Sequence, residues 1–168
     1  MSVTQLASSL TGSWILHQWT TQSQDADGNL LKTHYPFGER PDGLLIYSPD
    51  GFVSATVCRS GRPRVSQSVS PRQLSADVQA EAFKSFFHYA GRWAIADGQV
   101  RHEVSLALNP NMVGTVQLRS PSFNERGLSL EGMELIGDNK RRHVIQWTKP
   151  QNAPQPAPSV PSYGVDNS

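Results

Sequence analysis

The stretch HEVSLAL at residues 102–108 alternates polar and apolar side chains, and this alternation limits most sharply how the chain can fold. Side chains on a β-strand point to opposite faces with a period of two. His102 would therefore share a face with apolar neighbours, as either a buried structural histidine or a polar group inside a cavity. The predicted core-facing set is Val100, His102, Val104, Leu106 and Leu108.

Short apolar runs separated by Gly, Pro, Asn and Asp recur along the chain, which is typical of an antiparallel sheet that forms a barrel or a sandwich. Asp97-Gly98 and Ser48-Pro49-Asp50-Gly51 favour tight turns, because such turns need residues that accept a positive φ. The predicted fold class is therefore all-β. The runs predict strands at residues 13–21, 30–35, 43–48, 52–58, 91–96, 99–108, 113–119, 127–135 and 141–149.

One segment departs from the period of two. Leu74, Val78, Ala82 and Phe86 recur every four residues, which predicts a helix near residues 75–90. Its C-terminal end is aromatic. That end would pack on the sheet or, alternatively, form a lid over an apolar ligand.

The chain of 168 residues suits a single domain, predicted to span residues 1–149. Residues 150–168 are rich in proline and poor in large apolar side chains, which predicts a disordered tail. A net charge of +1 argues against nucleic acid as a partner. No apolar run suits a membrane helix and no secretory leader is visible, so we expect a cytoplasmic protein that binds no membrane.

The order of several motifs is similar to that of a known family. Gly12-Ser13-Trp14 has the GxW form of the lipocalin signature, and YAGRWAI at residues 89–95 and VIQWTK at 144–149 follow in the expected order. Over residues 6–149 the chain resembles the lipocalin-like domain family. The resemblance implies an antiparallel up-and-down β-barrel of about eight strands that holds one small ligand. It also implies a basic residue stacked over Trp14, which Arg141 or Arg142 would supply.

Ionisable groups on otherwise apolar faces give the candidate site. His102 is the clearest case, and Tyr47 shares a face with Leu45. Whether Arg119 points into or out of the barrel depends on the strand register, which the sequence leaves open. These three residues are predicted to be catalytic: His102 as proton shuttle, Arg119 as stabiliser of negative charge, and Tyr47 as orienting donor. The predicted ligand-binding residues are Trp93, Tyr89, Phe87, Leu106, Leu108 and His143.

The predicted function is that of a cofactor-free enzyme that cyclises, isomerises or dehydrates a polyketide- or terpenoid-like molecule in a natural-product pathway. This rests partly on analogy, because lipocalin-like barrels include cyclases. Without metal-ligand spacing, a phosphate loop or a dinucleotide fingerprint, we expect no metal and no cofactor. Two alternatives remain: a non-catalytic carrier of a hydrophobic small molecule, and an interaction module that uses the proline-rich tail.

Overall fold

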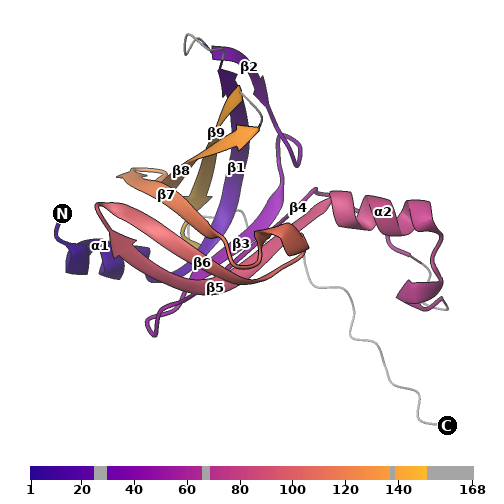
Figure 1. Ribbon diagram of the computed structural model, residues 1–168, viewed down its shortest axis with the longest axis horizontal. Coiled ribbons are helices and arrows are strands. Elements are labelled where there is room, and N and C mark those ends of the chain that lie inside the picture. The colour runs from indigo at the N-terminus through magenta and orange to yellow at the C-terminus, as the bar shows by residue number, and fades with distance from the viewer. Residues whose placement is uncertain (25–29, 66–68, 137–138, 151–168) are drawn as a thin grey trace.

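The chain folds into one antiparallel sheet that closes on itself (Figure 1). The computed structural model describes residues 1–24, 30–65, 69–136 and 139–150. Pairing of β1 with β9 closes eight of the strands into a barrel, and β2 extends the sheet beside the end of β1. The predicted all-β barrel is confirmed. The strands are β1 (Gly12–Gln24), β2 (Leu30–His34), β3 (Asp42–Tyr47), β4 (Phe52–Cys58), β5 (Phe86–Ala96), β6 (Gln99–Ala107), β7 (Val116–Asn124), β8 (Gly127–Ile136) and β9 (Asn139–Thr148).

Two of the strand connections are the tight turns that the sequence indicates. Asp97 and Gly98 have φ values of 53° and 73°, so both residues between β5 and β6 are left-handed, whereas at Asp50-Gly51 only Gly51 is, with a φ of 88°. The proline-rich residues 151–168 lie outside the described ranges. No helix within those ranges is long and apolar enough to cross a membrane.

A short N-terminal helix, α1 (Val3–Leu10), packs across the end of the barrel where β1 begins, and sequence analysis did not predict it. Ser2 and Gln5 form a capping box at its start, and Leu10 is buried in the core. The Leu10 carbonyl accepts a hydrogen bond of 2.7 Å from the Trp14 indole. The cation over the Trp14 ring is Lys149, with Nζ 3.7 Å from the ring centroid, which corrects the prediction of Arg141 or Arg142.

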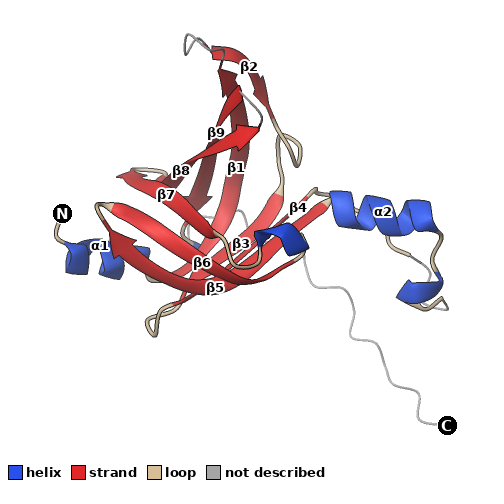
Figure 2. Cartoon of the chain, in the orientation of Figure 1, coloured by secondary structure: helices blue, strands red, loops and turns tan. Residues whose placement is uncertain are grey.

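The second helix, α2 (Ala76–Lys84), is shorter than predicted and does not pack on the barrel. None of its residues is buried, and Figure 2 shows it projecting away from the strands. Phe83 lies in α2, but the aromatic residues that follow it belong to β5, where Phe87 pairs with Val57 and Tyr89 pairs with Ala55. Aromatic side chains favour a pleated surface, and here sheet pairing prevails over the four-residue spacing.

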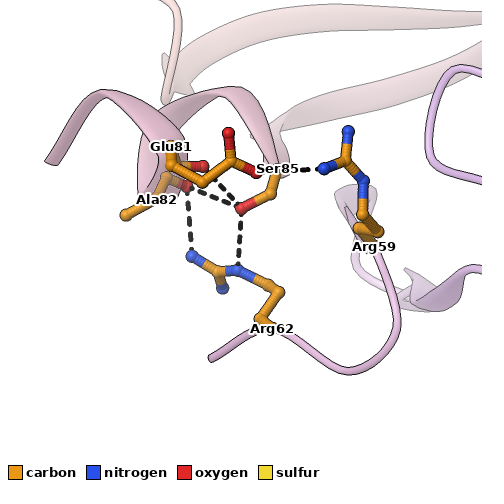
Figure 3. Close-up of polar contacts among 5 residues, drawn as sticks. All are labelled: Arg59, Arg62, Glu81, Ala82 and Ser85. Carbon is orange, nitrogen blue, oxygen red and sulfur yellow. Dashed lines mark hydrogen bonds and ion pairs between the residues drawn. The ribbon is translucent and has the colours of Figure 1, made fainter. Parts of the chain in front are cut away.

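Two arginines attach α2 to the barrel at its C-terminal end (Figure 3). Arg62 donates hydrogen bonds of 3.1 Å to the Ser85 hydroxyl and the Ala82 carbonyl, and its guanidinium lies over the Phe86 ring. Arg59 pairs with Glu81 at 3.0 Å, but both side chains are about half exposed, so this ion pair contributes little stability. The attachment depends mainly on Arg62.

A β-bulge in β6 reverses the alternation from which the core face was predicted. Gly91 of β5 pairs with Val104, whereas the preceding Ala90 pairs with Leu106, so Ser105 is an extra residue in β6. Val104 and His102 remain buried, but Leu106 is 65 % exposed on the outer surface. The prediction that Leu106 shares a face with His102 is therefore wrong.

We expect Gly91→Ala to destabilise the protein strongly, because a Cβ at this position would collide with the Glu103 carbonyl oxygen beside the bulge. The free energy of unfolding should fall by about 1–3 kcal/mol or more. Ser105→Ala, which changes an exposed side chain at the same bulge, should alter it by less than about 0.5 kcal/mol. Urea unfolding of both variants tests this account, and equal stabilities would contradict it.

Candidate functional site

A wide pocket of about 610 Å³ opens at the barrel end opposite α1. It lies where β7 and β8 separate, which Figure 1 shows as two diverging strands. The β7–β8 pairing stops at Ser120 and Glu131, and beyond this point β7 pairs only with β6 and β8 only with β9. The lining residues on which the site depends are Trp19, Phe87, Gln117, Arg119, Gly132, Glu134 and His143.

A narrow inner cavity lies deeper in the barrel. Its accessible volume is about 20 Å³, room for about one water molecule. Trp19, Phe87 and Arg119 line both spaces, so these side chains form the boundary between them. The barrel interior is otherwise filled by its own side chains, and the room for a ligand lies mainly at the mouth. Tyr89 and His102 line the inner cavity but not the wide pocket, whereas Trp147 lines the inner cavity and a third, small pocket.

His102 is the centre of a buried hydrogen-bonded chain that connects three strands. Its Nε2 lies 2.8 Å from the Tyr47 hydroxyl on β3, and its Nδ1 lies 2.7 Å from the Tyr89 hydroxyl on β5. His102 itself, on β6, is 1 % exposed. Both ring nitrogens are therefore satisfied, as a histidine in an apolar interior requires.

The tautomer of His102 decides which tyrosine keeps a free hydroxyl hydrogen. A neutral imidazole donates through one nitrogen and accepts through the other. If Nε2 carried the hydrogen, Tyr47 would be left with an unused O–H in a fully buried position that lines neither cavity. With the hydrogen on Nδ1, Tyr47 donates to Nε2 and Tyr89 has the free O–H at the inner cavity. We infer the Nδ1–H tautomer, because a buried unsatisfied donor costs about 1–3 kcal/mol.

Burial sets the protonation states of this chain. Together with the nearby positive charge of Arg119, which has the smaller effect, it lowers the pKa of His102 to about 3. Burial also raises the pKa of Tyr47 and of Tyr89, which the charge of Arg119 partly opposes. Near neutral pH all three groups are therefore uncharged, and the neutral His102 ring accepts a hydrogen bond at one nitrogen and donates at the other.

Arg119 faces the interior, which settles the register that the sequence left open. It pairs with Val100 across β6 and β7, and Val100 is fully buried. Its guanidinium donates to the Leu118 carbonyl at 2.8 Å and to the Gln117 side-chain oxygen at 3.3 Å. Within the described ranges it forms no ion pair with a carboxylate. Its positive charge is thus free to act on a ligand.

His143 also faces the pocket, in alternation with the buried Ile145 and Trp147. The Trp19 indole donates to its Nδ1 at 3.2 Å, so Nε2 carries the hydrogen and donates to Glu134 at 3.0 Å. Burial lowers the pKa of His143 despite the opposing effect of Glu134. This arrangement fixes Glu134 and the Trp19 ring at the mouth of the barrel.

The remaining predicted residues divide between the site and its surroundings. Phe87 and Tyr89 lie in the site, although from a strand and not from a helix. Trp93 donates to the Ser48 carbonyl at 3.1 Å and lines neither cavity. Leu108 is half-buried beyond the end of β6 and also lines neither cavity. Trp93 is nevertheless the pairing partner of His102 across β5 and β6, and its ring centroid lies 4.9 Å from that of Tyr47, whereas Leu108 is not brought into this group.

Several site residues were missed by sequence reasoning, above all Trp19 and Trp147. A register shift at His17 places Trp19 inside the barrel after Trp14 and Leu16. The three-residue spacing between Leu16 and Trp19 is the signal that could have found this bulge. No such signal distinguishes Gly132, because its importance comes from the Arg119 side chain on the neighbouring strand.

The low pKa of His102 predicts how stability depends on pH. Below about pH 6.5 the unfolded chain binds a proton at this residue, whereas the folded protein does so only near pH 3. Stability should therefore fall as pH decreases through this window, by up to about 1.4 kcal/mol per pH unit from this group. We expect the NMR signals of the His102 ring to remain those of a neutral imidazole from about pH 7 to about pH 4. A ring that titrates near its ordinary pKa would contradict this assignment.

Comparison with known families is consistent with this geometry. Residues 11–150 match the model of a lipocalin-like domain, whereas neither a curated protein nor a solved structure matches the chain. A barrel of this kind suggests binding of a small hydrophobic molecule. The match covers most of the sequence and coincides with the closed barrel, so the chain belongs to the lipocalin-like domain family.

Proposed function

We propose that the barrel binds one small, largely hydrophobic molecule through a carbonyl-type oxygen and promotes proton-transfer chemistry on it without a cofactor. Cyclisation, isomerisation or dehydration of a polyketide- or terpenoid-like molecule would fit, because polarising a carbonyl group assists each of them. The observation that carries the proposal is the buried chain of Tyr47, His102 and Tyr89 beside Arg119.

The interior offers hydrogen-bond donors that need acceptors. Trp147 lies between the inner cavity and a third, small pocket, and its buried indole N–H has no hydrogen-bond partner in the described part of the chain. Tyr89 keeps a free hydroxyl hydrogen in the inferred tautomer, and the Arg119 guanidinium adds a charged donor. An oxygen atom with lone pairs complements this set. A pure hydrocarbon would leave it unsatisfied.

The proposed roles differ from those expected from the sequence. Tyr89 would donate a hydrogen bond to the substrate oxygen, and Arg119 would stabilise the negative charge that develops there. His102 would not remove a proton itself, because its pKa of about 3 makes it a weak base. It would instead orient the Tyr89 hydroxyl, while Tyr47 fixes the imidazole from the other side.

The wide pocket would hold the apolar part of the substrate. Its volume of about 610 Å³ is in the range that accommodates a drug-sized molecule. The Trp19 and Phe87 rings lie edge to face, with their centroids 5.2 Å apart, and form a wall between the wide pocket and the inner cavity. Such a wall would hold a flexible substrate with its reactive groups together, which lowers the entropic part of a cyclisation barrier.

A non-catalytic carrier is the second candidate. The full hydrogen bonding of His102 favours it, because the same contacts would be expected of a histidine that only stabilises the barrel interior. In that case the donors would hold the ligand oxygen without changing the molecule. The two candidates differ in the fate of the ligand.

We expect Tyr89→Phe to separate catalysis from binding, because it removes one hydroxyl and keeps the ring. Native mass spectrometry would identify a co-purified molecule, and chromatography of metabolite extracts incubated with each protein would detect its conversion. Conversion should fall by about 100-fold or more in Tyr89→Phe, while binding changes much less.

Tyr35→Phe provides the matched control, because Tyr35 is exposed and lines neither cavity. It should retain wild-type conversion. A bound molecule that wild type, Tyr89→Phe and the control all return unchanged would establish a carrier and contradict catalysis.

A further inference from the structure

We propose that the ligand oxygen is acidic, a carboxylate or an enolate, and that Gly132 positions the Arg119 guanidinium that recognises it. This inference rests on the proposed function only in requiring that the barrel binds a small molecule. It makes Gly132 a positioning residue for ligand selectivity.

Gly132 leaves the space that the Arg119 side chain occupies. A Cβ on Gly132 would lie 2.5 Å from Nη1 and 3.0 Å from Cζ of Arg119, closer than non-bonded atoms approach. The φ of Gly132 is not in the left-handed region, so its backbone does not itself require glycine. A side chain at this position would displace the guanidinium. Its Cβ would also lie 3.2 Å from the Leu118 carbonyl oxygen.

The separation of β7 and β8 creates the space that the Arg119 side chain occupies. Arg119 and Gly132 are the first residues beyond the last β7–β8 pair, Ser120 and Glu131. The guanidinium lies in the widening gap and donates to Leu118 within its own strand. Both Arg119 and Gly132 line the wide pocket, and Arg119 also lines the inner cavity. The cation therefore stands where a ligand would pass from one space to the other.

The charges around the pocket favour an anion over a neutral carbonyl. Glu131 is paired with Arg142 at 2.6 Å, and Glu134 lies 3.8 Å from Arg141 and accepts a hydrogen bond of 3.0 Å from the neutral His143 ring. Arg119 has no such partner within the described ranges, so its charge is not compensated locally. An ionised acceptor gives a shorter and stronger hydrogen bond to a guanidinium than a neutral one does.

Two fluorescent probes test the charge preference directly. 8-Anilinonaphthalene-1-sulfonate carries a sulfonate that N-phenyl-1-naphthylamine lacks, and the aromatic framework is the same. We expect the wild type to bind the anionic probe about tenfold more tightly than the neutral probe. Arg119→Gln should remove this preference, whereas Arg101→Gln, the same change on the outer face of β6, should retain it.

Gly132→Ala tests the positioning role. It should reduce the ratio of the affinity for the anionic probe to that for the neutral probe severalfold, with thermal unfolding checking that the variant is folded. A preference that survives in folded Gly132→Ala would overturn the role of Gly132. Equal wild-type affinities for the two probes would overturn the acidic ligand and leave the proposed binding intact. Binding of neither probe would count against the proposed function itself.

Discussion

Two hydrogen bonds between tyrosine hydroxyls and one imidazole allow a polar group to lie in the centre of this barrel. Without them His102 would be a buried histidine with unsatisfied nitrogens, which the apolar interior would strongly disfavour. The partners come from β3 and β5, so the correct register of three strands is needed to form the chain. The bulge opposite Gly91 is part of that register, because it separates the buried His102 from the exposed Leu106.

The same sheet supplies both a filled interior and an accessible mouth. Large side chains occupy the end near α1, and the strands part at Arg119 and Gly132 to give the wide pocket. Arg119 connects the two regions, since it borders both cavities and its charge acts on Tyr47, Tyr89 and His102. A ligand oxygen at this boundary would meet a neutral hydroxyl and a cation together, which suits polarisation of a carbonyl or recognition of an acid.

Alternation and turn residues are local signals, so the sequence pattern predicted an antiparallel all-β fold, and the resemblance to the lipocalin-like domain family specified the closed barrel. The sequence pattern located all nine strands approximately, and it identified His102 and Tyr47 as residues on apolar faces, while it left open whether Arg119 faces inward. It failed where one extra residue reverses the alternation of inward and outward side chains along a strand. The extra Ser105 turns Leu106 outward, and the register shift at His17 turns Trp19 inward. The aromatic end of the predicted helix forms the start of β5. The sequence there fits both the four-residue spacing of a helix and the two-residue spacing of a strand, and only pairing with β4 distinguishes them.

The tautomer of His102 tests the central claim most directly, because it determines which hydroxyl is available to a ligand. Long-range nitrogen–proton NMR correlations on the labelled imidazole distinguish a protonated nitrogen from an unprotonated one. The account predicts a hydrogen on Nδ1 and none on Nε2, so that Tyr89 retains its O–H at the inner cavity. A hydrogen on Nε2 would place the free hydroxyl on the enclosed Tyr47 and would contradict a role for this chain in binding or catalysis.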